Sequence, residues 1–244
     1  MAVWKVIRGC TPLLSGVGSA YYHKYVKGEF SKEKRNELML AFGKQMLTTM
    51  NIVSKVSGAS PCPEPVLLLG NHISYLDIPL LLASVPCSFV AKKEIERWPL
   101  VAQGCRLIGT VFVDRSISRD RPNYRQMVAS RIVNDGDSIV LFPAGTTSLY
   151  EDVPWKLGGF KLAKDHGIKV QPFRLRYRPA REAAYIENDS LVPHAYKLLK
   201  RGRPLHAEVE FGQPRLINDI VADMHAIQKW CQEANFLDKF AKKA

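Results

Sequence analysis

The sequence predicts an α/β fold: a layered, largely parallel sheet flanked by helices and preceded by an N-terminal amphipathic helical segment. After residue 65, short apolar runs alternate with segments of helical periodicity, which is typical of a parallel sheet joined by crossover helices. The length of 244 residues fits one domain with a sizeable core. Hydrophobic residues make up 46% of the chain and charged residues 24%, which is ordinary for a folded protein.

The strands and helices are expected at the following positions. The predicted strands are short apolar runs at residues 66–70, 87–91, 108–113, 138–142, 169–177 and 205–211. The predicted helices cover residues 78–84, 97–105, 122–134, 156–166 and 218–240. Prolines at 61, 63 and 65 disfavour helix just before the first predicted strand. We therefore place a boundary near residue 58, with an N-terminal segment at 1–58 and the α/β domain at 59–244.

The N-terminal segment is basic and contains an apolar stripe. Residues 1–56 hold nine basic and three acidic side chains. The stripe recurs at steps of three and four, as on one helix face, at Met39, Phe42, Met46, Met50 and Val53. Such a stripe either packs into a core or lies on an anionic membrane, where each basic side chain adds about 1 kcal/mol. We interpret these N-terminal helices as membrane-associating.

Two strands are predicted to pair through their charges. Arg174, Arg176 and Arg178 alternate along one predicted strand, and Glu208 and Glu210 alternate along another. Alternate residues share one face of a strand. If these two strands are neighbours, the arginines are structural partners of the glutamates.

Charge and cysteine content limit the possible partners. There are 35 Lys and Arg against 23 Asp and Glu, a formal net charge of +12, which favours an anionic partner. No nucleic-acid recognition motif accompanies this charge, so nucleic acid is not expected. The five cysteines are scattered and show neither a disulfide framework nor a zinc spacing. No apolar stretch approaches the ~18 residues of a membrane-spanning helix.

A histidine and a carboxylate stand five positions apart in the string at 71–77, which reads NHISYLD. Positions i and i+5 lie roughly 140° apart around a helix, so His72 and Asp77 can meet only across a turn. We expect His72 to follow a buried strand and Asp77 to start the next helix, with Pro79 in its first turn. A carboxylate so placed can orient an imidazole as a general base. Otherwise Asp77 is an N-cap and His72 a hydrogen-bonded strand-end residue.

Four blocks in the same order resemble the lysophospholipid acyltransferases related to bacterial lysophosphatidic acid acyltransferase. They read NHISYLD at 71–77, GTVFVDR at 109–115, FPAGTTS at 142–148 and VQPF at 170–173. The similarity covers about residues 65–215. Strings typical of other enzymes, such as GxSxG, HExxH and the P-loop, do not occur.

The resemblance implies roles for the residues of the first block. His72 would be the base for the acceptor hydroxyl, and Asp77 would orient it. Asn71 is a motif position whose amide we place at the oxyanion, together with backbone N–H groups near the helix start. Ser74 is either a contact to the acceptor or a turn residue.

The other blocks are expected to bind anions. By resemblance, Arg115 binds the acceptor phosphate, for which its planar fork is suited; the alternative is a surface arginine paired with an aspartate. Gly145, Thr146 and Thr147 follow an apolar run and form either an anion-binding turn or an ordinary polar exit from a strand. Lys92 either meets a donor phosphate or is a solvated surface residue.

One motif position departs from the family pattern. The family has a glutamate in its FPEGT block, and this chain has Ala144. By resemblance that glutamate serves acceptor binding and site organisation, which a methyl group cannot replace. Either the chain is an active enzyme that Ala144 impairs, or it is a non-catalytic, lipid-binding member of the same fold.

The implied activity is transfer of a fatty acyl group from acyl-CoA or acyl carrier protein to the free hydroxyl of a lysophospholipid. Lysophosphatidic acid is the expected acceptor. No cofactor and no metal are implied. We expect a peripheral protein on the cytoplasmic face of an anionic membrane.

Overall fold

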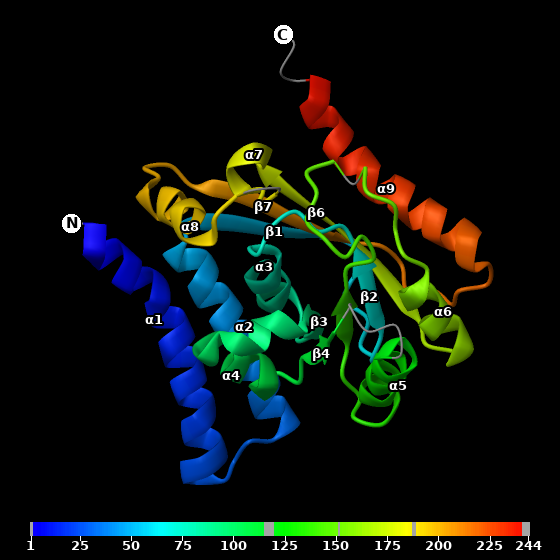
Figure 1. The fold of residues 1–244 in the computed structure, drawn as a ribbon, viewed down its shortest axis with the longest axis horizontal. Helices are drawn as coiled ribbons and strands as arrows, with labels where there is room; N and C mark the ends of the chain where they lie inside the picture. The colour runs from blue at the N-terminus through cyan, green and yellow to red at the C-terminus, as the bar shows by residue number, and fades with distance from the viewer. Residues whose placement is uncertain (1, 115–119, 151, 187–188, 241–244) are drawn as a thin grey trace.

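The computed structural model describes residues 2–114, 120–150, 152–186 and 189–240 (Figure 1). Within these ranges, seven strands form one sheet in the order β1-β7-β6-β2-β5-β3-β4. Only the pairing of β6 with β7 is antiparallel among the pairings described. The strands are β1 (Ile52–Gly58), β2 (Leu67–Gly70), β3 (Ser88–Lys92), β4 (Val111–Val113), β5 (Ile139–Leu141), β6 (Val170–Arg178) and β7 (Leu205–Phe211). The predicted α/β fold with a largely parallel sheet is confirmed.

Helices cover both faces of the sheet (Figure 1). One core cluster joins the sheet to α2 (Lys32–Thr49), α3 (Asp77–Ser84), α7 (Ala180–Ala183) and α8 (Leu191–Lys200). The other joins it to α5 (Asp120–Val133), α6 (Gly158–Asp165) and α9 (Ile220–Phe240). The remaining helical segments are α1 (Ala2–Tyr21), the π-helical turn η1 (Tyr22–Lys27), the 3₁₀ turn η2 (Lys93–Arg97) and α4 (Pro99–Leu107).

The central strand β2 shows why the strands are continuous apolar runs. Leu67 and Leu69 belong to one core cluster and Leu68 to the other. Successive side chains of a strand point to opposite faces, and both faces here are covered by helices. A sheet with one exposed face would carry a polar residue at every second position of its strands. β2 has no exposed face and therefore lacks this alternation.

Arg174 and Arg176 form the predicted ion pairs between the two strands, whereas Arg178 lies opposite His206. β6 pairs with β7 so that Arg174 lies opposite Glu210 and Arg176 opposite Glu208. The Arg174 guanidinium lies 2.8 Å from the Glu210 carboxylate, and that of Arg176 lies 2.9 Å from Glu210 and 3.4 Å from Glu208. The alternating charges thus fix the register of this antiparallel pair.

The N-terminal segment is more closely integrated than its sequence predicts. Residues 52–58, which the sequence assigns to the helical segment, form β1, an edge strand parallel to β7. The apolar stripe accordingly ends before Val53, which is 53% exposed on β1. In α2, Met39 and Leu47 are buried in the same core cluster as α3. The boundary expected near residue 58 therefore does not separate two hydrophobic cores.

A glycine permits this close contact between α2 and α3. A Cβ atom on Gly43 would lie 2.3 Å from the backbone nitrogen of Ala83. Any larger residue would force the helices apart. α7 and α8, which the sequence did not predict, lie between β6 and β7 along the chain.

Candidate active site

His72 and Asp77 meet across the turn between β2 and α3, as predicted from their spacing. The Nδ1 atom of His72 lies 2.7 Å from Oδ2 of Asp77. Asp77 is fully buried and is the first residue of α3, with Pro79 in the first turn. A carboxylate only accepts hydrogen bonds, so the imidazole carries its proton on Nδ1 and directs the Nε2 lone pair elsewhere.

The Asp77 carboxylate is held by three further donors. Its Oδ2 atom accepts hydrogen bonds from the backbone N–H groups of Ile73 at 2.7 Å and Ser74 at 3.0 Å. Its Oδ1 atom accepts one from the Tyr177 hydroxyl at 2.8 Å. The backbone donors come from the preceding loop rather than from α3, so Asp77 organises that loop instead of capping its own helix. This fixed network locks the position of the His72 ring.

The strings at 71–77 and 142–148 lie against each other. The His72 ring stacks on Phe142, with centroids 3.9 Å apart and planes 11° apart. The backbone N–H of Ser148 donates to the His72 carbonyl at 2.7 Å. β2 and β5 are parallel neighbours, so their carboxyl ends place both strings at the same edge of the sheet.

Asn71 and Ser74 both form hydrogen bonds with the nearby backbone. Both ends of the buried Asn71 amide bond the backbone of Leu175: Nδ2 donates to its carbonyl at 2.9 Å and Oδ1 accepts from its N–H at 2.7 Å. The amide therefore continues the pairing of β2 with β6, and its placement at the oxyanion stays a prediction. Ser74 is fully buried, and its backbone carbonyl accepts from Asp77 N–H at 3.1 Å, as in a turn.

The glycine and threonines of the second string form a tight turn. Gly145 has φ +74°, a conformation that favours glycine, and its N–H donates to the Phe142 carbonyl at 3.1 Å. Thr146 is exposed, whereas the Thr147 hydroxyl donates to the carbonyl of Tyr185. Since the Thr147 proton is used within the protein, Thr146 supplies the exposed hydroxyl that this turn could offer to an anion.

The remaining residues predicted for the site are Arg115, Lys92 and Ala144. Arg115 lies outside the described residues. Lys92 is exposed at the end of β3. Ala144 is 4% exposed and packs in the apolar cluster that also contains Trp155 and Phe160.

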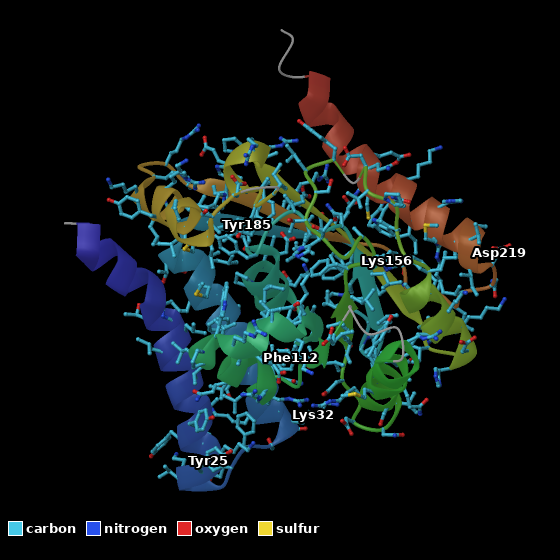
Figure 2. All side chains as sticks on the ribbon, in the orientation of Figure 1. Tyr25, Lys32, Phe112, Lys156, Tyr185 and Asp219 are labelled. Carbon is cyan, nitrogen blue, oxygen red and sulfur yellow. The ribbon has the colours of Figure 1, made fainter. Side chains whose placement is uncertain are left out.

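Tyr177 and Tyr185 are site residues that the sequence analysis missed. The Tyr185 N–H donates to the Ile73 carbonyl at 3.0 Å, so this residue bonds both motif loops; Figure 2 labels it between α3 and α8. Burial, then the charge of Asp77, raises the pKa of Tyr177 well above its usual value. The alternation in β6 indicated that Tyr177 faces inward, but its bond to Asp77 depends on the register of β6 with β2.

An apolar cavity adjoins the start of α3. It has a volume of about 140 Å³ and lies among α1, α2, α3 and α4. Val17, Phe42, Ile78 and Leu82 contribute to its walls. Ile78 directly follows Asp77 in α3, whereas His72 and Asp77 themselves are not among the lining residues.

Within the described part of the chain, no group of three His, Cys, Asp or Glu side chains is arranged to hold a metal ion. No described helix is long and apolar enough to cross a membrane.

Comparison with known proteins identifies relatives over most of the α/β region. A family model described as Acyltransferase matches residues 53–176. A lyso-ornithine lipid O-acyltransferase of Pseudomonas aeruginosa is 35% identical over 61% of this chain and 58% of its own length. A 1-acyl-sn-glycerol-3-phosphate acyltransferase of Neisseria gonorrhoeae is 36% identical over 59% of this chain and 57% of its own. The chain thus matches less than two thirds of the length of these relatives.

A solved structure has the same fold. The 1-acyl-sn-glycerophosphate (LPA) acyltransferase of Thermotoga maritima superposes with a TM-score of 0.61 at 21% identity. The match covers 98% of both chains, so it includes the N-terminal helices as well as the sheet.

Proposed function

Because this chain belongs to the acyltransferase family, we propose that it transfers a fatty acyl group to the free hydroxyl of a lysophospholipid, with lysophosphatidic acid as the acceptor. The donor is acyl-CoA or acyl carrier protein. The observation that carries the proposal is the His72–Asp77 pair, whose carboxylate is fixed by Tyr177 and two backbone donors. The names of the relatives support the same reaction class.

The proposed chemistry is direct transfer. Nε2 of His72 accepts the proton of the acceptor hydroxyl as its oxygen attacks the carbonyl carbon of the thioester. The tetrahedral intermediate then collapses, the C–S bond breaks, and the imidazolium returns the proton to the departing sulfur. Asp77 stabilises the imidazolium that forms between these steps, and a positioned base of this kind contributes roughly 10² to 10⁴ in rate.

The apolar cavity supports a lipid substrate. Its walls at Val17, Phe42, Ile78 and Leu82 are hydrocarbon, and Ile78 is the residue that follows Asp77 in the sequence. A fatty acyl chain placed there gains about 0.8 kcal/mol for each CH₂ removed from water. Its reactive end would then lie near the start of α3.

The helical hairpin of α1 and α2 supports association with a membrane surface. In η1, which joins these helices, Tyr25 is 66% and Val26 72% exposed, beside the cations Lys24 and Lys27. Figure 2 labels Tyr25 at the end of this hairpin that lies away from the sheet. Exposed aromatic and apolar side chains next to lysines are typical of segments that lie in the headgroup region. We propose that this tip contacts an anionic bilayer on its cytoplasmic side.

The test is mass spectrometry of the lipids formed from a panel of lyso-acceptors. The panel contains lysophosphatidic acid, lyso-ornithine lipid and lysophosphatidylcholine, each offered with acyl-CoA or acyl carrier protein. We expect a diacyl product from lysophosphatidic acid that the His72→Ala variant does not form. A product formed equally by both proteins would contradict the assignment of His72, and no product from any pairing would contradict the activity.

Ala144 favours a second candidate, a non-catalytic or impaired lipid-binding member of the family. The methyl group lies in an apolar cluster, and no carboxylate occupies this motif position. Binding of a lyso-lipid without turnover by the parent chain, together with turnover by Ala144→Glu, would support this candidate.

A further inference from the structure

A second, strongly basic cavity lies on the same side of the sheet as the His72–Asp77 pair. It has a volume of about 730 Å³, within the usual range for a ligand pocket, and is formed by α7, α8 and the segments that follow them. Among the described residues that line it, the charged ones are the cations Arg181, Lys197, Arg201 and Arg203 and the carboxylates Glu182 and Asp189. We call these six residues and the space they enclose the basic cavity.

Among the described lining residues, the carboxylates are fewer than the cations. Asp189 forms a two-pronged pair with Arg181, at 3.1 and 3.4 Å. Glu182 is shared between Arg203, which it bonds directly, and Arg201, whose Nη1 lies 3.7 Å away. Among the described lining residues, four cations therefore face two carboxylates.

Arg201 is a lining residue whose hydrogen bonds are incomplete. Its side chain is only 11% exposed. Nε and Nη2 donate to the Arg203 carbonyl at 3.3 Å, but the buried Nη1 has no hydrogen-bond partner in the described part of the chain. A buried donor without an acceptor costs about 1 to 3 kcal/mol, so a bound acceptor here would recover that energy.

The basic cavity is physically connected to the loop that carries His72. His194, at its wall, shares a hydrogen bond through Nδ1 with the Tyr75 hydroxyl at 3.1 Å. Burial lowers the pKa of His194 and raises that of Tyr75, so at neutral pH the Tyr75 hydroxyl keeps its proton and donates it to a neutral imidazole. Tyr75 lies three residues from His72 in the same motif, so a ligand in the cavity would sit beside this loop.

We infer that the basic cavity binds a phosphate monoester of one of the two substrates, at a place separate from the Gly145–Thr147 turn. A dianion would neutralise the excess charge, and its oxygens would accept from Nη1 of Arg201 and the ammonium of Lys197. Two sources share this chemistry. One is the 3′-phosphate of a nucleotide donor such as coenzyme A, and the other is the glycerol phosphate head of the acceptor.

Calorimetric titration of the full chain with two soluble probes separates these sources. Adenosine 3′,5′-bisphosphate represents the nucleotide, glycerol 3-phosphate represents the lipid head, and adenosine and glycerol are the phosphate-free controls. The test variants are Lys197→Gln and Arg201→Gln. The matched control is Lys200→Gln, which removes the same charge from the same helix but whose ammonium packs 4.5 Å from the Tyr196 ring and does not line the cavity.

We expect one probe to bind saturably and its phosphate-free control not to bind. Lys197→Gln and Arg201→Gln should each weaken that binding about 10-fold, the equivalent of one charge-assisted hydrogen bond, and Lys200→Gln less than about 2-fold. Lys197 is exposed, so Lys197→Gln should fold and tests the inference even if Arg201→Gln does not fold.

Two results would overturn the inference. One is that neither probe binds saturably. The other is that Lys200→Gln weakens binding as much as Lys197→Gln, which would mean attraction to net charge rather than a site. Because the readout is binding and not turnover, the outcome is independent of whether the chain catalyses acyl transfer.

Discussion

Replacing Tyr177 by phenylalanine tests whether the buried network around Asp77 is as important as its geometry indicates. The Tyr177 ring is 1% exposed, and its hydroxyl donates to Asp77 Oδ1 at 2.8 Å. Phenylalanine fills the same space without the hydroxyl. The variant therefore leaves one carboxylate oxygen in the core without its donor and changes little else.

The expected magnitude follows from the charge on the acceptor. A hydrogen bond to a charged group contributes about 1.5 to 3 kcal/mol, so the free energy of unfolding should fall by that amount in a chemical denaturation experiment. The effect on catalysis should be smaller than that of changing Asp77 itself, because Oδ2 still accepts from His72 and two backbone N–H groups. We expect kcat to fall about 10-fold with KM unchanged, as for a positioning residue.

The pH dependence of stability provides a readout specific to this hydroxyl. Burial and the charge of Asp77 hold the pKa of Tyr177 well above 10 in the folded protein, whereas the unfolded chain loses this proton near pH 10. Above pH 10 the unfolded state therefore binds fewer protons than the folded state, and stability falls as pH rises. Tyr177 accounts for about 1 kcal/mol of that loss between pH 10 and 11, which Tyr177→Phe should not show.

Tyr25→Phe is the control, since it removes a hydroxyl from a ring that is 66% exposed. It should keep the parent stability and the parent loss above pH 10. If Tyr177→Phe behaves in the same way as Tyr25→Phe in both experiments, the hydrogen bond to Asp77 contributes nothing and our account of the network is wrong.

Four further predictions concern the site and the membrane. In Asp77→Asn the amide can keep the contacts of the carboxylate if the Tyr177 hydroxyl turns, so this variant should fold normally and lose roughly 10² in kcat. Asp77→Ala loses these contacts, and its free energy of unfolding should fall by several kcal/mol. Equal stability of the two variants would contradict the buried network. Arg115→Ala should raise KM for a phosphate-bearing acceptor and leave the donor KM unchanged; unaltered discrimination against phosphate-free acceptors would exclude a phosphate contact. Ala144→Glu should raise kcat by roughly 10². It should also lower the free energy of unfolding, because the carboxylate enters a position that is 4% exposed. An unchanged or lower rate would mean that the chain works without the glutamate. Val26→Glu should reduce sedimentation with anionic liposomes at low salt, while Val133→Glu, 63% exposed on α5, should not; similar losses would indicate an effect of net charge alone.

The sequence by itself determined the strands of the sheet between residues 65 and 215 and the central pair of the site. A strand buried on both faces must be a continuous apolar run, so β2 could be recognised from composition, whereas β6 could be recognised from its alternation of arginines with apolar or aromatic residues. The spacing of His72 and Asp77 excluded one helix face and required a turn. These are local properties, and local geometry depends on residues close together in the chain.

The tertiary structure decided the rest because the remaining contacts join residues far apart in the chain. The register of β2 with β6 determines that Asn71 bonds the backbone of Leu175 and that Tyr177 reaches Asp77, about a hundred positions earlier. β1 is an edge strand with an exposed outer face, so it lacks the apolar pattern that identifies a buried strand. The charge of Arg201 was evident in the sequence, but its burial and its unpartnered Nη1 arise only where the segments after α7 and α8 enclose the basic cavity.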